Sequence, residues 1–228
     1  MTATISVVIP VFNGERYLSA ALDSAGAQSR PPLEIIVVDD GSTDGTAAIL
    51  AARPDVRVLR QPNQGPAAAR NRGLGVAVGD YVAMLDADDL WPPDRLDVLG
   101  AVLDNDPAVG VVWGTQQLLI EPGAPMPDWV PPGDPATLSP TELPRPTGAF
   151  MARRAAFDAV GGYDPDLRHG EDSDWALRVK DLGIGWAMID DVVLTRRLHE
   201  HNLTLDSNAQ RRAMFAVLQR RAARRRAP

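Results

Sequence analysis

The sequence contains no cysteine, which excludes disulfide bridges and thiolate metal sites. It has no apolar run near the roughly 20 residues that a membrane-spanning helix requires. It also lacks the basic segment followed by an apolar segment that marks a signal peptide. With 228 residues, the chain is long enough for one substantial domain and a small appendage. These absences predict a cytoplasmic protein without a membrane span.

Two catalytic signatures are also missing. The sequence has no Gly-Lys-Ser or Gly-Lys-Thr of a P-loop and no Gly-x-Ser-x-Gly elbow of a serine hydrolase. The glycines of residues 73–79 are superficially similar to a dinucleotide-binding fingerprint. They precede an expected strand instead of following one, however, and the last glycine is misplaced. None of these enzyme classes is therefore indicated.

Charge is distributed unevenly along the chain. The net charge is −7, and residues 210–228 contain seven arginines and no acidic residue, so the preceding residues carry −14. An acidic body is unsuited to binding nucleic acid, and we expect no nucleic-acid partner. Such a body suits a protein that gathers cations and uses them to hold phosphate groups.

Strands and helices alternate through the first half of the chain. We expect strands at residues 5–10, 33–38, 56–59 and 82–85. We expect helices at residues 15–25, at 66–78, and from a cap at Ser42 or Thr43 to about residue 52. This alternation predicts right-handed crossovers and an α/β fold with one Rossmann-like, mostly parallel sheet flanked by helices.

The strand at 82–85 is followed by Asp-Ala-Asp-Asp at 86–89. A short, continuously apolar run is typical of a central strand that is covered on both faces. If the strand continues past Asp86, the side chains of Asp86 and Asp88 project to the same side. Two close carboxylates favour a shared divalent cation. The alternative is that the aspartates cap the helix that starts near residue 92.

Three segments lie at the carboxyl ends of expected parallel strands. They are residues 10–12, the pair Asp39 and Asp40, and residues 86–89. Ligands of open α/β sheets bind outside the carboxyl ends of the strands. We therefore expect these segments to share one crevice, which is the strongest purely physical indication of a binding site.

The second half of the chain is less regular. We expect helices at 96–103, 153–160 and 170–182, and strands at 109–119, 148–151, 184–189 and 192–197. Residues 121–146 contain nine prolines, which exclude regular structure and indicate a long, semi-rigid loop.

A further helix is expected from Asp206 into the arginine-rich tail. Within it, Met214, Phe215, Val217 and Leu218 lie near several arginines. This pattern indicates either a helix docked on the body with a solvated arginine face or a helix that makes peripheral contact with a membrane surface. We treat residues 206–228 as a basic C-terminal helix and favour the docked alternative.

Five segments together resemble the family 2 glycosyltransferases of the GT-A fold, an inverting group that uses nucleotide-activated sugars. The matching segments are residues 6–14, 37–46, 63–71, 85–89 and 170–172, and the resemblance extends over about residues 5–204. It implies a GT-A domain at 1–210, with a nucleotide-sugar-binding half at 1–105 and a smaller acceptor-side half at 106–205.

The resemblance also implies a set of residues that bind the donor sugar nucleotide: Pro10, Val11, Phe12, Asn13, Glu15, Asp39, Asp40, Gly65, Arg70, Asp86 and Ala87. Asp39 is expected to accept a hydrogen bond from the base or the ribose, and Arg70 to approach the nucleotide unless it is a surface residue. At Phe12, where tyrosine is common in the family, the ring can still stack on a base although the hydroxyl is lost.

A metal site and a catalytic pair follow from the same resemblance. Asp86 and Asp88 correspond to the DxD pair that holds Mn²⁺ or Mg²⁺, with Asp88 as the direct ligand. His199 is a further candidate ligand, against the alternative of a structural histidine. Asp172 corresponds to the general base, and Glu171 is expected to position it. The alternative for both is a pair of acids favoured by the helix dipole.

The implied reaction is the non-processive transfer of a single sugar from a nucleoside diphosphate sugar, a UDP-sugar foremost, to a hydroxyl group. The acceptor class stays open among glycans, lipid-linked glycans, natural products and peptides. The Gln-x-x-Arg-Trp signature of processive family members is absent. Two alternatives remain: a nucleotidyltransferase, and a protein that binds sugar nucleotides without turnover.

Overall fold

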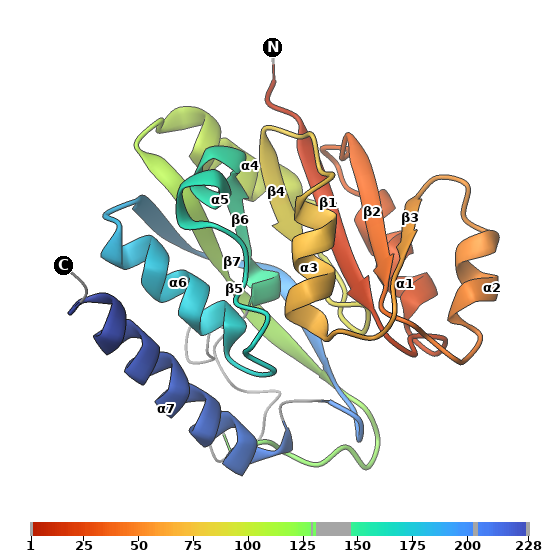
Figure 1. The fold of residues 1–228 in the computed structure, drawn as a ribbon. Helices are drawn as coiled ribbons and strands as arrows, with labels where there is room; N and C mark the ends of the chain where they lie inside the picture. Colours follow the sequence, from red (N-terminus) through yellow and green to blue (C-terminus); the bar gives the residue numbers. More distant parts are fainter. Residues whose placement is uncertain (1, 129, 131–146, 203–204, 227–228) are drawn as a thin grey trace.

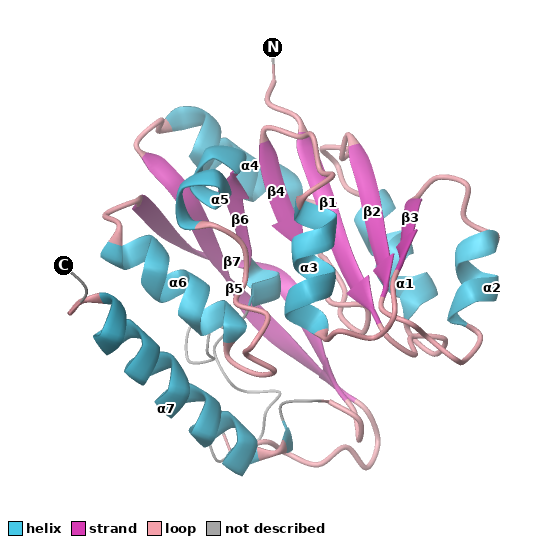
Figure 2. Ribbon diagram, in the orientation of Figure 1, coloured by secondary structure: helices cyan, strands magenta, loops and turns pink. Residues whose placement is uncertain are grey.

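One seven-stranded sheet lies between helices at the centre of the described chain (Figures 1 and 2). The computed structural model describes all residues except 1, 129, 131–146, 203–204 and 227–228. Most of the proline-rich loop expected at 121–146 therefore lies outside the described residues.

The first half alternates as predicted, with β1 Ile5–Val11, α1 Leu18–Gly26, β2 Glu34–Asp39, α2 Thr46–Ala51, β3 Arg57–Arg60, α3 Pro66–Leu74 and β4 Tyr81–Met84. The second half contains α4 Arg95–Asn105, β5 Val109–Ile120, the 3₁₀ turn η3 Thr147–Ala149, β6 Phe150–Arg153, α5 Arg154–Val160, α6 Glu171–Asp181, β7 Gly185–Leu198 and α7 Ser207–Arg224.

The strand order is β3-β2-β1-β4-β6-β5-β7. β1 pairs in parallel with β2 and β4, β2 pairs in parallel with β3, and β5 pairs in parallel with β7. Only β6 runs antiparallel, and it lies between β4 and β5. The predicted α/β fold with one mostly parallel sheet is thus confirmed. Because β1, β2 and β4 are parallel, the loops that follow them lie at the same end of the sheet, next to the carboxyl ends of the strands.

Both faces of the sheet are covered. α1 and α4 pack on one face through Leu22, Leu96 and other apolar residues. α3, α5 and α6 pack on the other face, where the fully buried Trp175 of α6 contacts the aromatic ring of Phe150. This double coverage explains why every residue of β1 is buried. No helix in the described part of the chain is long and apolar enough to cross a membrane.

Two local predictions were wrong. The cap expected at Ser42 or Thr43 is absent, because α2 begins only at Thr46. There, the Asp44 carboxylate accepts hydrogen bonds from both the backbone N–H and the hydroxyl of Thr46. The two strands expected at 184–189 and 192–197 are one strand, β7, which pairs with β5 along its length with three register irregularities.

Candidate active site

A cavity of about 1400 Å³ opens at the carboxyl ends of β1 and β4. All residues expected to bind the donor, the metal or the acceptor hydroxyl line this cavity, with the exception of Asp39. Residues from β1 and its loop therefore face the same space as the loop after β4, the start of α6 and the segment after β7. The structure thus places together segments that are distant in the sequence.

The loop after β1 forms one wall of the cavity. Phe12 is half exposed there, so its ring can receive a flat ligand. Asn13 adopts a left-handed conformation, with φ of 53°. Its side-chain oxygen accepts the Thr43 N–H at 2.9 Å, and the Glu15 carboxylate accepts the Gly45 N–H at 2.6 Å. These bonds fix the loop after β1 against the loop after β2.

Asp40 shapes the neighbouring wall. One of its buried carboxylate oxygens accepts hydrogen bonds from the Gln61 amide and the Gln64 N–H, and the other accepts the Gly65 N–H at 2.8 Å. Gly65 has a φ of +90°, which few side-chain-bearing residues adopt. Asp39 is also buried, and it accepts the Ser42 N–H at 2.9 Å. Its contact with a base or ribose stays a prediction.

The loop after β4 differs from the extended conformation considered above. β4 ends at Met84, and the chain then turns, with the Asp89 N–H donating to the Asp86 carbonyl at 3.1 Å. Asp86 and Asp88 are therefore not placed by strand alternation. Asp89 is buried and accepts the Arg197 N–H at 2.9 Å. Burial, followed by the charges of Asp88 and Asp86, raises its pKa well above the usual value.

Arg70 joins the two halves of the cavity. Its guanidinium donates to Asp86 Oδ1 at 2.6 Å and to Glu171 Oε1 at 2.5 Å, and the residue is only 5% exposed. Burial opposes the charge of Arg70, but the two carboxylates outweigh it and raise the pKa of the guanidinium. Burial likewise raises the pKa of Glu171, and Arg70 opposes that effect. No local sequence pattern predicts this buried bridge, because the partners of Arg70 are 16 and 101 residues away along the chain.

The carboxylate of Asp88 lies next to an imidazole. Its Oδ2 atom is 3.1 Å from His199 Nε2 and accepts a hydrogen bond from the Asn202 amide at 3.2 Å. The ring of Tyr17 lies 4.6 Å from that of His199 and supports it. Neither Tyr17 nor Asn202 was predicted. Asn202 lies three residues after His199, and it contacts Asp88 only because the fold brings this segment next to the loop after β4.

The Asp88–His199 pair fits a divalent cation in part. A carboxylate and an imidazole are both suitable ligands for Mn²⁺, and the remaining positions could be filled by phosphate oxygens and water. One carboxylate oxygen of Asp86, Oδ1, is instead paired with Arg70. Across the described residues, no three His, Asp or Glu side chains gather closely enough to form a complete protein cage. The residues present therefore suit a cation that is shared with a phosphate-bearing ligand.

Asp172 lies in the first turn of α6, on the cavity wall. α6 begins after Gly170, whose φ is +76°. One carboxylate oxygen of Asp172 accepts the Ser173 N–H at 2.7 Å. Among the described residues, no donor occupies the other oxygen. Asp172 therefore presents a partly buried oxygen that can accept a proton from a bound hydroxyl group.

Similar proteins of known structure have the same fold. TarS from S. aureus, residues 1–349 in complex with UDP-GlcNAc, matches with a TM-score of 0.70 at 22% identity, covering 94% of this chain and 65% of that one. A mannosyltransferase from Pyrobaculum calidifontis in complex with GDP-Man and Mn²⁺ matches with a TM-score of 0.62 at 24% identity, covering 86% and 57% of the two chains. The expected GT-A fold is confirmed.

Sequence comparison identifies relatives that are glycosyltransferases. An uncharacterized glycosyltransferase of Nostoc sp. is 42% identical over 113 residues, which is 47% of this chain and 35% of the relative. Chondroitin synthase of Pasteurella multocida is 26% identical over 222 residues, 94% of this chain and 23% of that protein. The chain thus spans about a third or less of these relatives. Residues 6–161 match the model of glycosyl transferase family 2, and the chain belongs to this family.

Proposed function

We propose that the protein is an inverting glycosyltransferase that moves a single sugar from a nucleoside diphosphate sugar, a UDP-sugar foremost, to an acceptor hydroxyl. The observation that carries this proposal is that Asp88 and Asp172 line one cavity, where Arg70 bridges the nearby residues Asp86 and Glu171. The sugar-nucleotide complexes of TarS and the Pyrobaculum enzyme support the same class of donor.

The donor is expected to occupy the side of the cavity formed by the first half of the chain. The exposed ring of Phe12 can stack on the base, and the loop held by Asp40 can approach the ribose. Asp88 and His199 would hold Mn²⁺ or Mg²⁺, which supplies Lewis-acid stabilisation of the diphosphate leaving group when bound. Asp86 would fix Arg70 through Oδ1, which leaves its other oxygen for the cation.

The acceptor is expected to lie on the side of α6. Asp172 takes the proton of the acceptor hydroxyl. The oxygen of that hydroxyl forms a bond to the anomeric carbon of the donor sugar, and the bond from that carbon to the diphosphate breaks. Attack from the face opposite the leaving group inverts the anomeric centre. Glu171 holds the start of α6 in place through Arg70, so Asp172 keeps its position relative to the donor.

We keep two further expectations as proposals. Without the Gln-x-x-Arg-Trp signature, one sugar per binding event is expected, in a cytoplasmic setting. Peripheral contact of α7 with a membrane also stays a prediction: Phe215 is 67% exposed and Leu218 is 50% exposed. Flotation of the protein with anionic vesicles tests it, and the contact is absent if the protein stays at the bottom of the gradient.

Product analysis tests the reaction. The protein, Mn²⁺, an α-linked donor (UDP-glucose, UDP-GlcNAc or GDP-mannose) and a panel of sugar acceptors are incubated together and followed by proton NMR. We expect release of the nucleoside diphosphate and a product with the opposite anomeric configuration. Retained configuration contradicts inversion, and release of pyrophosphate favours a nucleotidyltransferase. Donor binding with neither transfer nor hydrolysis supports a binding protein without turnover.

A further inference from the structure

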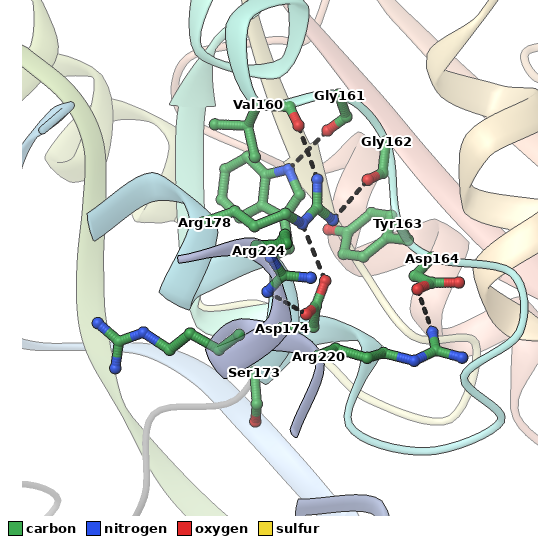
Figure 3. A network of polar contacts seen from close by, with 12 residues as sticks. Val160, Gly161, Gly162, Tyr163, Asp164, Ser173, Asp174, Arg178, Arg220 and Arg224 are labelled. Atoms are coloured by element: carbon green, nitrogen blue, oxygen red, sulfur yellow. Dashed lines mark hydrogen bonds and ion pairs between the residues drawn. The ribbon is translucent and has the colours of Figure 1, made fainter. Parts of the chain in front are cut away.

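The C-terminal half of α7 is clamped to α6 and the loop before it (Figure 3). The fully buried carboxylate of Asp174 forms ion pairs with the guanidinium groups of Arg178, at 2.8 Å, and Arg224, at 2.7 Å. Arg220 pairs with Asp164 in the same region (Figure 3). Because Asp174 lies two residues after the proposed base, these contacts fix α7 relative to the catalytic end of α6.

The N-terminal half of α7 consequently reaches the cavity. A Cβ atom added at Gly170 would lie 3.6 Å from the Cβ of Ala213 and 3.5 Å from Val217, so α7 touches the residue that precedes α6. Within one turn of Ala213, Arg211 and Met214 line the same cavity as Asp172. α7 is therefore part of the wall next to the proposed base.

The cavity has different charges on its two sides. On the donor side it is lined mainly by acidic residues: Glu15, Asp40, Asp44, Asp86, Asp88 and Asp89. Arg16, Arg70 and Arg196 also line the cavity, but Arg16 is paired with Glu121, and Arg70 is paired with Asp86 and Glu171. Near α6, Arg168 and Arg211 line it together with His169. The acids on that side are Asp172 and Glu171, and Glu171 is already paired with Arg70.

These two arginines are available to a ligand. Arg168 is exposed and forms no ion pair with any residue that the structure describes. Arg211 contacts Asp128 at 3.4 Å, with side chains 76% and 66% exposed. An ion pair this exposed contributes little stability, so an anionic ligand can replace it. Arginine binds phosphate and carboxylate groups through parallel hydrogen bonds.

We propose that the acceptor carries an anionic group, a phosphate or a carboxylate, that Arg168 and Arg211 bind while its hydroxyl faces Asp172. This inference rests on the proposed function and names its acceptor class. The cavity also has the room, since its 1400 Å³ exceeds the roughly 300–1,000 Å³ of a site for one small ligand. The anionic group would set which acceptor is used and would make its binding sensitive to salt.

Matched acceptors test this inference. Transfer is measured with methyl hexosides, the corresponding hexuronides, and hexose phosphates, at low and high salt. We expect kcat/KM to be at least tenfold higher for one of the two anionic series than for the neutral series, and the difference to shrink at high salt. Comparing hexuronides with hexose phosphates distinguishes the carboxylate from the phosphate. Calorimetry of the same probes on UDP-loaded protein provides a readout that needs no turnover.

The variant R168Q/R211Q should lose most of this preference, measured as the ratio of kcat/KM for anionic and neutral acceptors. R212Q, on the same helix but outside the cavity lining, should keep the wild-type ratio. Equal affinity and equal kcat/KM for charged and neutral probes overturn the inference. It is also overturned if the double variant keeps the preference for anionic acceptors. Weakened donor binding in that variant would then show that the arginines hold the donor diphosphate.

Donor hydrolysis in the absence of acceptor separates this inference from the proposed function. A wild-type protein that neither binds nor hydrolyses any nucleotide sugar contradicts the proposed function itself. A protein that hydrolyses or transfers the donor sugar but shows no preference for anionic acceptors contradicts only the anionic acceptor class.

Discussion

Replacing Asp172 with asparagine is expected to lower kcat by about 10²–10⁴, the usual contribution of a general base. Asparagine keeps the shape of the side chain and removes the oxygen that accepts the proton. The donor does not contact this residue in our account, so donor affinity should stay within a few-fold of the wild type. Single-turnover transfer and calorimetric titration of the donor measure the two quantities separately.

D166N is the matched control for D172N. Asp166 lies in the loop before α6, and its side chain is 83% exposed with a distant contact to Arg220 at 4.0 Å. It does not line the cavity, and its kcat should equal that of the wild type. E171Q should fall between the two in rate, since it weakens the bond to Arg70 without removing the base. If D172N transfers sugar at the wild-type rate at pH 7, the base is another residue.

Replacing Asp88 with alanine should remove the cation-dependent part of donor binding and lower turnover by two to three orders of magnitude, on the scale of about 10²–10³ for a lost electrostatic contact in an active site. The reason is that His199 alone would remain to hold the cation beside the diphosphate. Donor affinity with and without Mn²⁺, and kcat at saturating donor, measure the effect.

D86A separates the roles of the two aspartates. It should affect Mn²⁺ dependence less than D88A does, because Asp86 is paired with Arg70. It should instead lower the free energy of unfolding, since the buried guanidinium of Arg70 loses one of its two carboxylates. Full activity of D88A in the presence of a chelator would remove the cation from the mechanism.

The sequence was sufficient to predict the first half of the fold and the crevice. The apolar runs of β1, β2 and β4 have the length and composition of buried parallel strands. The segments at their carboxyl ends converge because parallel strands end on the same side of the sheet. The paired aspartates Asp86 and Asp88 were already a candidate cation site, and the family resemblance added His199 and Asp172 and singled out Asp88 as the direct ligand. The structure places these four residues on the cavity, and their roles stay proposals.

Other features depend on contacts that are distant in the sequence. The antiparallel placement of β6 between β4 and β5 could not be predicted from four residues with an unremarkable pattern. The burial of Arg70 depends on carboxylates from two other segments. The register of β7 and the clamp between α6 and α7 likewise follow from tertiary packing, which overrides local propensity.

The most direct test of the central claim, that this cavity binds a nucleoside diphosphate sugar together with a divalent cation, is a thermal-unfolding panel. UDP-, GDP- and other nucleotide sugars are each added with and without Mn²⁺ to the wild type and to D88A. We expect one donor to stabilise the wild type by about 2.7 kcal/mol at a hundredfold excess over its Kd. We expect D88A to lose the Mn²⁺-dependent part of this stabilisation. No stabilisation by any nucleotide sugar at saturating concentration would contradict the claim.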